Sequence, residues 1–369
     1  MKLVFTVTND LCYDQRMQRI CSTLCAEGHE VTLVGRFRKK SPLLPAAAYR
    51  QVRLLCWFEK GKLFYLEYNF RLFWWLLFQK SFDVYTGIDL DTIMPCLAVA
   101  RLKGKKCYYD AHEYFSEVPE VVDRPLTKWI WEMVARICIP RVDRAYTVGP
   151  ALAQIFQKRY SIPFQVVRNM PLQQAKISNA ASSTPQLLNS STPPTILYQG
   201  VLNAGRGLET AIAAMQKIEG AVFWLAGEGD LSEELRQLAK DLQVESKVRF
   251  LGYLNPKELR SVTQQASIGL NLLENRGLSY YYSLANKAFD YVQAGVPSIQ
   301  MNFPEYLALQ EEHRVFYLIN RLEVEVLVQA IEHLLGDNEL YLALQENCRV
   351  AAKEWCWERE KENLIAIYA

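Results

Sequence analysis

Residues 283–297 read SLANKAFDYVQAGVP, and the interpretation of the whole chain starts from this stretch. Small or apolar side chains recur in it at spacings that suit one buried face of a helix. Ser283 is a suitable N-cap, and Gly295 with Pro297 forms a helix-ending pair. Residues 296–301 then read as a short buried strand. The side chains of the predicted buried face are Ala285, Ala288, Phe289, Val292 and Ala294.

The polar side chains of this stretch gather at the start of the predicted helix. A helix N-terminus offers unpaired N–H groups and the positive end of the helix dipole, so it suits a phosphate group. Asn286 and Lys287 add a donor and a cation there, and Asp290 follows one turn later, where it suits a pair of sugar hydroxyls. The alternative is an ordinary capped helix whose lysine and aspartate are solvated.

The pattern S-L-x-N-K-x-F-[DE]-Y-x-x-A-G-x-P resembles the donor-nucleotide segment of GT-B fold glycosyltransferases of the retaining family four (group 1) type. Members of that family carry two Glu residues eight positions apart around this segment. Asp290 stands at the second of these positions and Tyr282 at the first. The resemblance implies that Ser283, Asn286 and Asp290 contact the donor nucleotide, with Asp290 at the ribose.

Length, charge and cysteine usage narrow the class of protein. The 369 residues fit two domains of ordinary size, and half of them are apolar, which is enough for a core in each. The formal net charge of +2 argues against a nucleic-acid partner held by a broad basic field. Nine scattered cysteines form no CxxC pair and no zinc-ligand spacing, so we expect reduced thiols, a cytoplasmic protein and no metal site. Met1 leads directly into a predicted strand, so no signal peptide is expected.

The most apolar run is LFWWLLF over residues 72–78, far shorter than the roughly 20 residues that span a bilayer. We expect a buried helix there. The alternative is a membrane-facing surface that includes Arg71 and Lys80. A second helix, predicted over residues 126–141, carries Trp129, which we also expect in the core.

The chain begins with a βαβ pattern, with strands over residues 2–9 and 31–35 and a helix over 14–26. It lacks the GxGxxG of dinucleotide-binding folds. The pattern N-D-x-x-x-D-x-R in the first loop resembles the first unit of family-four glycosyltransferases, whose loop lies over the acceptor and the donor phosphates. The alternative is a strand-end turn with an Asx cap. The residues to which the resemblance assigns acceptor binding are Asn9, Asp10 and Asp14.

Two carboxylates, Asp89 and Asp91, follow the strand predicted over residues 83–87. Neighbouring carboxylates suit a metal or acid–base chemistry, but Asp is also a favoured N-cap. We therefore predict Asp91 as the cap of a helix over residues 92–102 and leave the role of Asp89 open.

His112 and Glu113 follow the strand predicted over residues 106–110, at the edge where open α/β sheets bind ligands. The segment D-A-H-E resembles the D-x-H-[DE] segment of the same family. The resemblance implies that His112 lies beside the transferred sugar and that Glu113 contacts the acceptor. The alternative is a solvated loop.

The composition changes over residues 173–194, which are rich in Ser, Thr, Asn, Gln and Pro and read as a mobile linker. We divide the chain into an acceptor-binding domain over 1–170, a linker over 171–194 and a nucleotide-sugar-binding domain over 195–345. The GT-B resemblance implies that a C-terminal helix over 346–369 returns to the first domain.

A glycine-rich loop joins the strand predicted over residues 195–198 to a helix over 208–218, an arrangement that can cradle phosphate. Arg206 matches the second of two basic residues that hold the donor pyrophosphate in the family. Val201 stands at the first position, and Lys287 is the candidate replacement. The glycines of this loop are Gly200, Gly205 and Gly207.

Two later turns complete the predicted donor site. Gly227 lies in a GEG turn that resembles the family's GxG loop, and Ser232 is the predicted N-cap of the helix that follows. Tyr253 follows the strand predicted over residues 248–251. The resemblance implies that backbone groups at this turn read the base and that Tyr253 stacks on it; ordinary packing of the ring is the alternative.

The patterns and the resemblance together predict an α/β protein of two Rossmann-like domains facing a cleft, the GT-B fold. The implied reaction is metal-independent hexosyl transfer, with retention of configuration, from a UDP- or GDP-sugar to an acceptor hydroxyl. Arg206, Lys287 and the helix start near Ser283 would stabilise the leaving diphosphate. His112 would orient the sugar, and no cofactor beyond the donor is expected.

The expected partners are a nucleotide-sugar and a carbohydrate or lipid-linked acceptor, in polysaccharide or glycolipid biosynthesis. The expected location is the cytoplasm, with peripheral contact to the inner face of the membrane. Two alternatives stay open: another nucleotide-sugar enzyme on the same fold, such as an epimerase, and a non-catalytic nucleotide-sugar-binding or scaffold protein. Val201 and Tyr282, which replace a basic residue and a Glu of the family pattern, favour the second of these.

Overall fold

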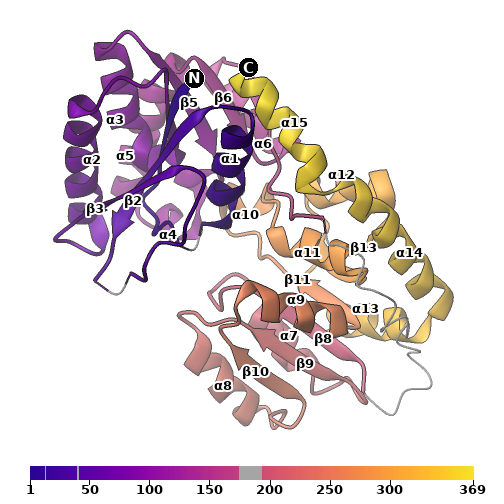
Figure 1. Ribbon diagram of the computed structural model, residues 1–369. Helices are drawn as coiled ribbons and strands as arrows, with labels where there is room; N and C mark the ends of the chain where they lie inside the picture. Colours follow the sequence, from indigo (N-terminus) through magenta and orange to yellow (C-terminus); the bar gives the residue numbers. More distant parts are fainter. Residues whose placement is uncertain (13, 40, 174–192) are drawn as a thin grey trace. The chain divides into compact units, whose positions relative to one another are not determined.

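The computed structural model describes residues 1–12, 14–39, 41–173 and 193–369, which form two compact units (Figure 1). Each unit has its own parallel sheet. The linker predicted over residues 171–194 lies outside the described residues except for its two ends. The N-terminal unit comprises Met1–Asn169, Gly277–Ser279 and Glu360–Ala369, and the C-terminal unit comprises Met170–Arg276 and Tyr280–Arg359.

The N-terminal unit is built on a seven-stranded sheet in the order β3-β2-β1-β4-β5-β6-β7, with every neighbouring pair parallel. Its strands are β1 (Lys2–Thr6), β2 (Glu30–Phe37), β3 (Arg50–Leu55), β4 (Val84–Ile88), β5 (Lys106–Ala111), β6 (Arg144–Thr147) and β7 (Phe164–Val166). Its α-helices are α1 (Gln15–Ala26), α2 (Gly61–Phe78), α3 (Asp89–Leu102), α4 (Pro119–Val122), α5 (Pro125–Cys138) and α6 (Pro150–Tyr160).

Helices cover both faces of this sheet because its strands are apolar on both sides. All five residues of β4, VYTGI, are buried, as expected for a strand in the middle of a parallel sheet. Tyr108 packs against Tyr368 of α15 (Trp357–Tyr368), whereas Tyr109, which points to the opposite face, packs against Phe164. Phe164 in turn contacts Phe156 of α6. The last turns of α15 therefore complete the core of the N-terminal unit.

The C-terminal unit has a six-stranded parallel sheet in the order β10-β9-β8-β11-β12-β13. Its strands are β8 (Thr195–Gln199), β9 (Val222–Ala226), β10 (Val248–Gly252), β11 (Ile268–Asn271), β12 (Ser298–Met301) and β13 (Phe316–Ile319). Its helices include α7 (Leu208–Ala214), α8 (Ser232–Asp241), α9 (Pro256–Gln265), α11 (Asn286–Ala294), α12 (Pro304–His313), α13 (Val324–Gly336) and α14 (Asn338–Glu354).

The strand order reverses at one point in each sheet, between β1 and β4 and between β8 and β11. Ligands of open α/β sheets bind beyond the carboxyl ends of the strands at such points. The loops that follow β8 and β9 in the C-terminal unit, and β4 and β5 in the N-terminal unit, carry the polar residues described below.

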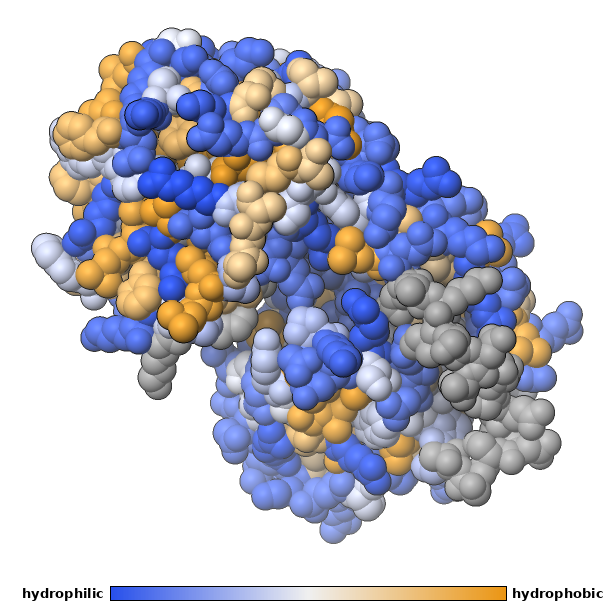
Figure 2. Space-filling view, viewed as in Figure 1, coloured by the Kyte–Doolittle hydropathy of each residue, from blue (hydrophilic) through white to orange (hydrophobic). Residues whose placement is uncertain are grey.

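The prediction of buried aromatic helices is wrong for part of α2 and α5. Leu72 and Leu76 of α2 are buried, but Trp74 and Phe78 are 41% and 77% exposed, and Trp129 of α5 is 60% exposed. Because α2 is apolar on all sides, its sequence does not show which face the core takes. Apolar residues (orange) lie on the surface at the side of the N-terminal unit where Figure 1 draws α2 (Figure 2). In the described parts of the chain, no helix is long and apolar enough to cross a bilayer.

Two predicted helix caps are also wrong. The helix α11 begins at Asn286 after the cap residue Ala285, and the hydroxyl of Ser283 instead donates to the carbonyl of Tyr280 at 2.9 Å. Ser232 is the first helical residue of α8 rather than its cap, and its hydroxyl accepts from the backbone N–H of Gly229. In both cases the serine hydroxyl forms a hydrogen bond with a backbone group of the turn before the helix. Such local bonds of serine commonly compete with helix capping.

Candidate functional site

The loops after β8 and β9 are in direct contact because both carry a glycine. The backbone N–H of Gly200 donates to the carbonyl of Ala226 at 3.0 Å. A Cβ on Gly227 would lie 1.9 Å from the carbonyl oxygen of Gly200, so no other residue fits there without moving the backbone. Gly227 also has a φ of +151°, which favours glycine. The two glycines therefore hold two loops of exposed peptide groups side by side.

The loop from Gly200 to α7 is packed against the core at its far end. Gly207 has a φ of +67° and precedes the first residue of α7, and a Cβ there would lie 2.5 Å from the carbonyl oxygen of Leu272. Gly205, with a φ of +80°, lies against the ring of Tyr280. Arg206, between these glycines, stacks its guanidinium over the same ring at 4.8 Å. Its buried Nε bonds to no acceptor among the residues that the structure describes.

Lys287, on the first turn of α11, is a buried lysine. Its side chain is 9% exposed, and Nζ lies 3.8 Å from the ring centroid of Tyr198. Nζ would lie 3.5 Å from a Cβ placed on Gly200, so it faces the glycine loop. Over the described ranges, no carboxylate lies within ion-pair distance of it. Burial lowers the pKa of Lys287 well below its ordinary value, and the nearby Arg206 lowers it further, against Asp290, which raises it.

An anion between these two cations would remove the cost of burying them. A buried charge is normally paired, because transferring an unpaired ion out of water has a large cost in free energy. Phosphate oxygens accept charge-assisted hydrogen bonds from both lysine and arginine. The arrangement of Arg206, Lys287 and the Gly200 loop is therefore suited to a phosphate or diphosphate group.

Asp290 lies one turn after Lys287, and its carboxylate accepts from Nε2 of Gln199 at 2.9 Å. The other side-chain atom of Gln199 accepts from the hydroxyl of Thr263 at 2.7 Å, so the amide orientation is fixed from both ends. Gln199 is the last residue of β8 and is buried. This network holds the Asp290 carboxylate at the carboxyl end of the sheet, beside the cations.

The structure thus brings together most of the predicted donor-site residues: Gly200, Gly205, Arg206, Gly207, Gly227, Lys287 and Asp290. Tyr253 lies at the end of β10 and is 69% exposed, so the alternative of ordinary packing is wrong. Asn286 is exposed at the start of α11, and Val201 and Tyr282 are not buried. Sequence reasoning missed Tyr198 and Tyr280, the aromatic rings beneath the two cations. The available signal for Tyr198 was its position in the strand directly before the glycine loop.

The N-terminal unit has a second polar cluster, after β4 and β5. Asp110 is fully buried and accepts from Arg16 at 3.1 Å and from Nε2 of His112 at 3.0 Å. Burial raises the pKa of Asp110, but Arg16 and His112 outweigh it and hold that pKa below its ordinary value. Burial lowers the pKa of His112, but Asp110 outweighs it and leaves that pKa raised. His112 is therefore an oriented imidazole with a carboxylate partner.

Asp89 holds the other side of His112. Its carboxylate accepts from the backbone N–H of His112 at 2.9 Å, and Oδ2 lies 3.9 Å from Nδ1 of the ring. Asp89 has a φ of +53°, an uncommon conformation for a residue other than glycine, and such strain often accompanies functional positions. Burial raises the pKa of Asp89 well above its ordinary value, although His112 acts in the opposite direction.

Asp91 is not the predicted N-cap, because α3 already begins at Asp89. Its buried carboxylate accepts from the hydroxyl of Thr8 at 2.5 Å. Burial raises the pKa of Asp91 to about 6, against the lowering effect of the Thr8 hydrogen bond. A buried carboxylate with a raised pKa destabilises the fold once it ionises.

We expect Asp91→Asn to stabilise the N-terminal unit at pH 8 by up to about 3 kcal/mol and to have little effect at pH 4. The folded pKa of Asp91 is higher than its unfolded pKa, so the contribution of Asp91 to stability is most favourable at low pH and becomes destabilising as the pH rises from about 4 to about 6. The measurement is the urea midpoint of both proteins over this range. A difference between them that does not change with pH would contradict the prediction.

The predicted acceptor-binding residues of the first loop all have partners within the unit. Asp14 caps α1 by accepting from the backbone N–H of Met17 at 3.0 Å. Asp10 lies 3.5 Å from Arg53 and accepts from the backbone N–H of Cys12. Asn9 donates to Asp14, at the long distance of 3.5 Å. Asp10 and Asp14 thus have the Asx-turn and capping roles that were the alternative to acceptor binding; Glu113 lies beside His112 in the chain.

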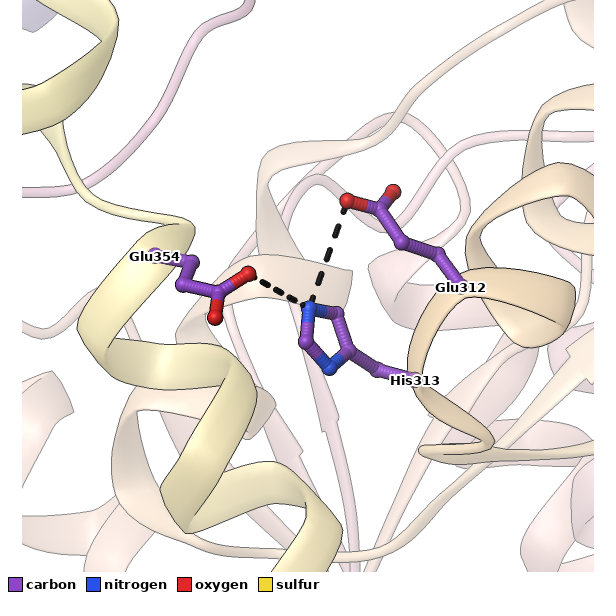
Figure 3. A group of neighbouring side chains, drawn as sticks. All are labelled: Glu312, His313 and Glu354. Atoms are coloured by element: carbon purple, nitrogen blue, oxygen red, sulfur yellow. Dashed lines mark hydrogen bonds and ion pairs between the residues drawn. The ribbon is translucent and has the colours of Figure 1, made fainter.

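One group of described residues has the composition of a metal ligand set: Glu312, His313 and Glu354 (Figure 3). Nε2 of His313 lies 2.9 Å from Glu354 and 4.0 Å from Glu312. Both carboxylates are exposed, and the contact joins the end of α12 to the end of α14. We interpret the group as a hydrogen-bonded contact between two helices.

Two family models match the chain, one in each half. Residues 15–170 match the family described as Glycosyltransferase Family 4. Residues 193–337 match the family described as Glycosyl transferases group 1. The two matches take in both polar clusters described above.

Curated relatives match shorter segments. The lipopolysaccharide core biosynthesis glycosyltransferase LpsE of Rhizobium meliloti is 26% identical over 155 residues, which are 42% of this chain and 43% of that protein. The uncharacterized glycosyltransferase MJ1607 of Methanocaldococcus jannaschii is 37% identical over 76 residues, 20% of each protein. The matches therefore span less than half of the length of these relatives.

Solved structures match over the whole chain. Sucrose-phosphate synthase from Thermosynechococcus elongatus has a TM-score of 0.79 at 16% identity, covering 100% of this chain and 98% of that one. HepE of Anabaena, solved in complex with UDP, has a TM-score of 0.74 at 12% identity, and the match covers 100% of this chain and 99% of that one. WaaG, a glycosyltransferase involved in lipopolysaccharide biosynthesis, has a TM-score of 0.71 at 16% identity over 98% of each chain. At these identities the likeness shows the fold.

Two parallel-sheet α/β units that match these structures define the GT-B fold. One glycosyltransferase family model matches each half of the chain, so the chain carries two glycosyltransferase domains, one of Glycosyltransferase Family 4 and one of Glycosyl transferases group 1. The predicted fold class and family are confirmed.

Proposed function

We propose that this protein transfers a hexose from a UDP- or GDP-sugar to an acceptor hydroxyl, with retention of configuration, during glycan or glycolipid biosynthesis. The observation that carries the proposal is the buried Lys287, which has no acidic partner within ion-pair distance among the described residues and faces the Gly200 loop beside Arg206. Structures of HepE with UDP and with UDP-glucose support a nucleotide-sugar as the ligand of such a fold.

The cations would act on the leaving group. Negative charge develops on the diphosphate as the bond to the sugar breaks, and preorganised cations in a site without water stabilise that charge. A diphosphate beside Lys287 also keeps the ammonium protonated, because it supplies the opposite charge that the buried site lacks. The Asp290 carboxylate, held by Gln199, is placed to accept from hydroxyls of the ribose.

His112 would orient the transferred sugar through its ring, which Asp110 and Asp89 hold. The proposed reaction uses no metal ion and no cofactor other than the donor. The proposed acceptor is a carbohydrate or a lipid-linked glycan, and the proposed location is the cytoplasm, peripheral to the inner face of the membrane. The lipopolysaccharide-related names of LpsE and WaaG support an acceptor of this class.

The test is calorimetric binding of UDP-, GDP-, ADP- and dTDP-sugars to the wild type and to Lys287→Ala. We expect saturable binding of one donor, weakened about 10- to 100-fold by the substitution, since charge-assisted hydrogen bonds contribute about 1.5–3 kcal/mol. Lys217→Ala, which removes an exposed lysine of the same unit paired with Glu325, is the matched control and should bind as the wild type does. Absence of binding across the panel would overturn the donor site.

A second candidate is a protein that binds the nucleotide-sugar without transferring it. Val201 and Tyr282, at positions where the family pattern has a basic residue and a Glu, favour it. Release of the free nucleoside diphosphate, measured with the bound donor and a panel of glycan acceptors in the presence of a chelator, separates the two. Turnover supports the metal-independent transferase, and tight binding without release of diphosphate supports the second candidate.

A further inference from the structure

The helix α2 presents a continuous apolar stripe to solvent along its whole length. Its buried side is formed by Phe64, Tyr68, Leu72 and Leu76, and the opposite side by large apolar side chains that are all exposed. Successive rings of the exposed side contact one another, and Trp74 stacks on Phe78 with centroids 5.6 Å apart. Single exposed apolar residues are ordinary, but a stripe of this length is not. The exposed side chains are Leu63, Leu66, Phe70, Trp74 and Phe78.

The helix α5 carries a second exposed stripe with the same helical spacing. Both helices pack against α3, and they touch each other where Tyr65 of α2 and Trp131 of α5 are in edge-to-face contact, with centroids 5.5 Å apart. Both belong to the N-terminal unit. We call the two stripes together the α2/α5 face. The exposed side chains of α5 are Leu126, Trp129, Met133 and Ile137.

Basic residues are concentrated in the segments that carry or flank the α2/α5 face. The segments that carry or flank it, residues 60–80, 101–106 and 124–141, contain twelve Lys and Arg and only two Glu, in a chain whose net charge is +2. Lys103 donates to the carbonyls of Leu76 and Gln79 at the end of α2, which places its ammonium group close to the apolar stripe. Both Glu residues of these segments are paired with arginine. Two of the lysines, Lys105 and Lys128, are paired with Asp83 and Glu117 just outside the segments, and basic residues still predominate.

This charge distribution decides between the occupants of such a surface. A second copy of the chain, docked through the same face, would bring two strongly basic surfaces together, which costs energy. An anionic bilayer instead offers headgroups to the basic rim and an interfacial region to the Trp, Phe and Leu side chains. We propose that the α2/α5 face binds peripherally to an anionic lipid membrane, with its aromatic side chains at the level of the headgroups.

The proposal gives a surface and a lipid chemistry to the peripheral location stated under the proposed function. The proposal rests on the proposed function only where it assumes that the membrane carries the acceptor. Membrane binding itself does not require the donor site. The α2/α5 face lies within one unit, and its residues are separate from the donor-site residues of the C-terminal unit.

The test is co-sedimentation of the full chain with vesicles of phosphatidylcholine alone or mixed with phosphatidylglycerol, at low and high salt. We expect binding to the anionic vesicles that high salt weakens. Phe70→Ser combined with Phe78→Ser should reduce it about 10-fold or more, because it removes two apolar anchors. Lys62→Gln combined with Lys80→Gln should reduce it about 25-fold, since each juxtamembrane cation contributes about 5-fold.

The control is Leu342→Ser combined with Val350→Ser, which removes two exposed apolar side chains from α14 in the C-terminal unit. It should bind vesicles as the wild type does. All variants should keep the melting temperature and the donor affinity of the wild type, so a loss of vesicle binding cannot arise from unfolding. No binding by the wild type, or equal loss in the control, would overturn the proposal. Self-association that the Phe70 and Phe78 substitutions abolish would assign the face to a second copy instead.

Because vesicle binding is measured without nucleotide, its failure leaves the donor-site test unaffected. Failure of nucleotide binding, in turn, leaves the membrane result standing. The two proposals can therefore fail separately.

Discussion

Gly227→Ala is expected to destabilise the C-terminal unit by about 4 kcal/mol and to abolish nucleotide-sugar binding. A Cβ at this position would lie 1.9 Å from the carbonyl oxygen of Gly200, and the contact is with backbone, which cannot rotate away. The loops after β8 and β9 must separate, and the hydrogen bond from Gly200 to Ala226 is lost. Overpacking and backbone strain each contribute about 1–3 kcal/mol.

Gly220→Ala is the matched control for this substitution. Gly220 also has a positive φ, +68°, but a Cβ there would meet no atom within 4 Å. The Gly220→Ala substitution should therefore destabilise the unit only by the free energy of placing alanine at a positive φ, about 1–2 kcal/mol, and should leave nucleotide binding intact. The measurements are urea unfolding and donor calorimetry on both variants. Equal stability of the two variants, with nucleotide binding retained in Gly227→Ala, would contradict the close approach of the two loops.

Asp110→Ala is expected to cost about 3–5 kcal/mol of stability in the N-terminal unit, because it leaves the buried Arg16 without its counter-charge. Asp110 and Arg16 have side chains that are 0% and 4% exposed, and their closest contact is 3.1 Å. Because the pKa of Asp110 is held below its ordinary value, its contribution is complete at neutral pH and is lost only as the pH falls through that lowered pKa.

The variant Arg16→Met combined with Asp110→Ala should recover part of this loss, since it removes the unpaired charge as well. Glu30→Ala, which breaks the exposed Lys2–Glu30 pair, is the control and should cost at most about 1 kcal/mol. Urea unfolding at pH 7 measures all three. A cost for Asp110→Ala no larger than that for Glu30→Ala would show that the buried pair does not stabilise the unit.

Much of the fold could be predicted from local sequence. Strands that are apolar throughout, each followed by a glycine or polar loop and a helix, indicate parallel α/β units, and the structure confirms two of them. The glycine positions of the donor site, such as Gly200 and Gly207, were also visible, because their conformation depends on the loop itself. Lys287 was visible as a cation at a helix start.

What the sequence did not show depends on contacts between distant segments. The rings of Tyr198 and Tyr280 lie under Lys287 and Arg206 only because the strand, the loop and the helix pack together. The exposed side of α2 could not be recognised, because the helix is apolar on every side and only its neighbours define the core face. Asp91 looked like a helix cap, whereas the start of α3 at Asp89, at a strained φ, leaves the Asp91 side chain buried.

The position of Tyr368 has a consequence for the order of events during synthesis. Its ring packs on Phe5 of the first strand, and its hydroxyl bonds to that of Thr86 across 282 positions of sequence. The residues that close this core, 360–369, follow the whole of the C-terminal unit along the chain. Domains usually fold in the order in which they leave the ribosome. Here the ribosome must translate the second unit in full before the first can bury its sheet, so the first unit to emerge is the last to be completed.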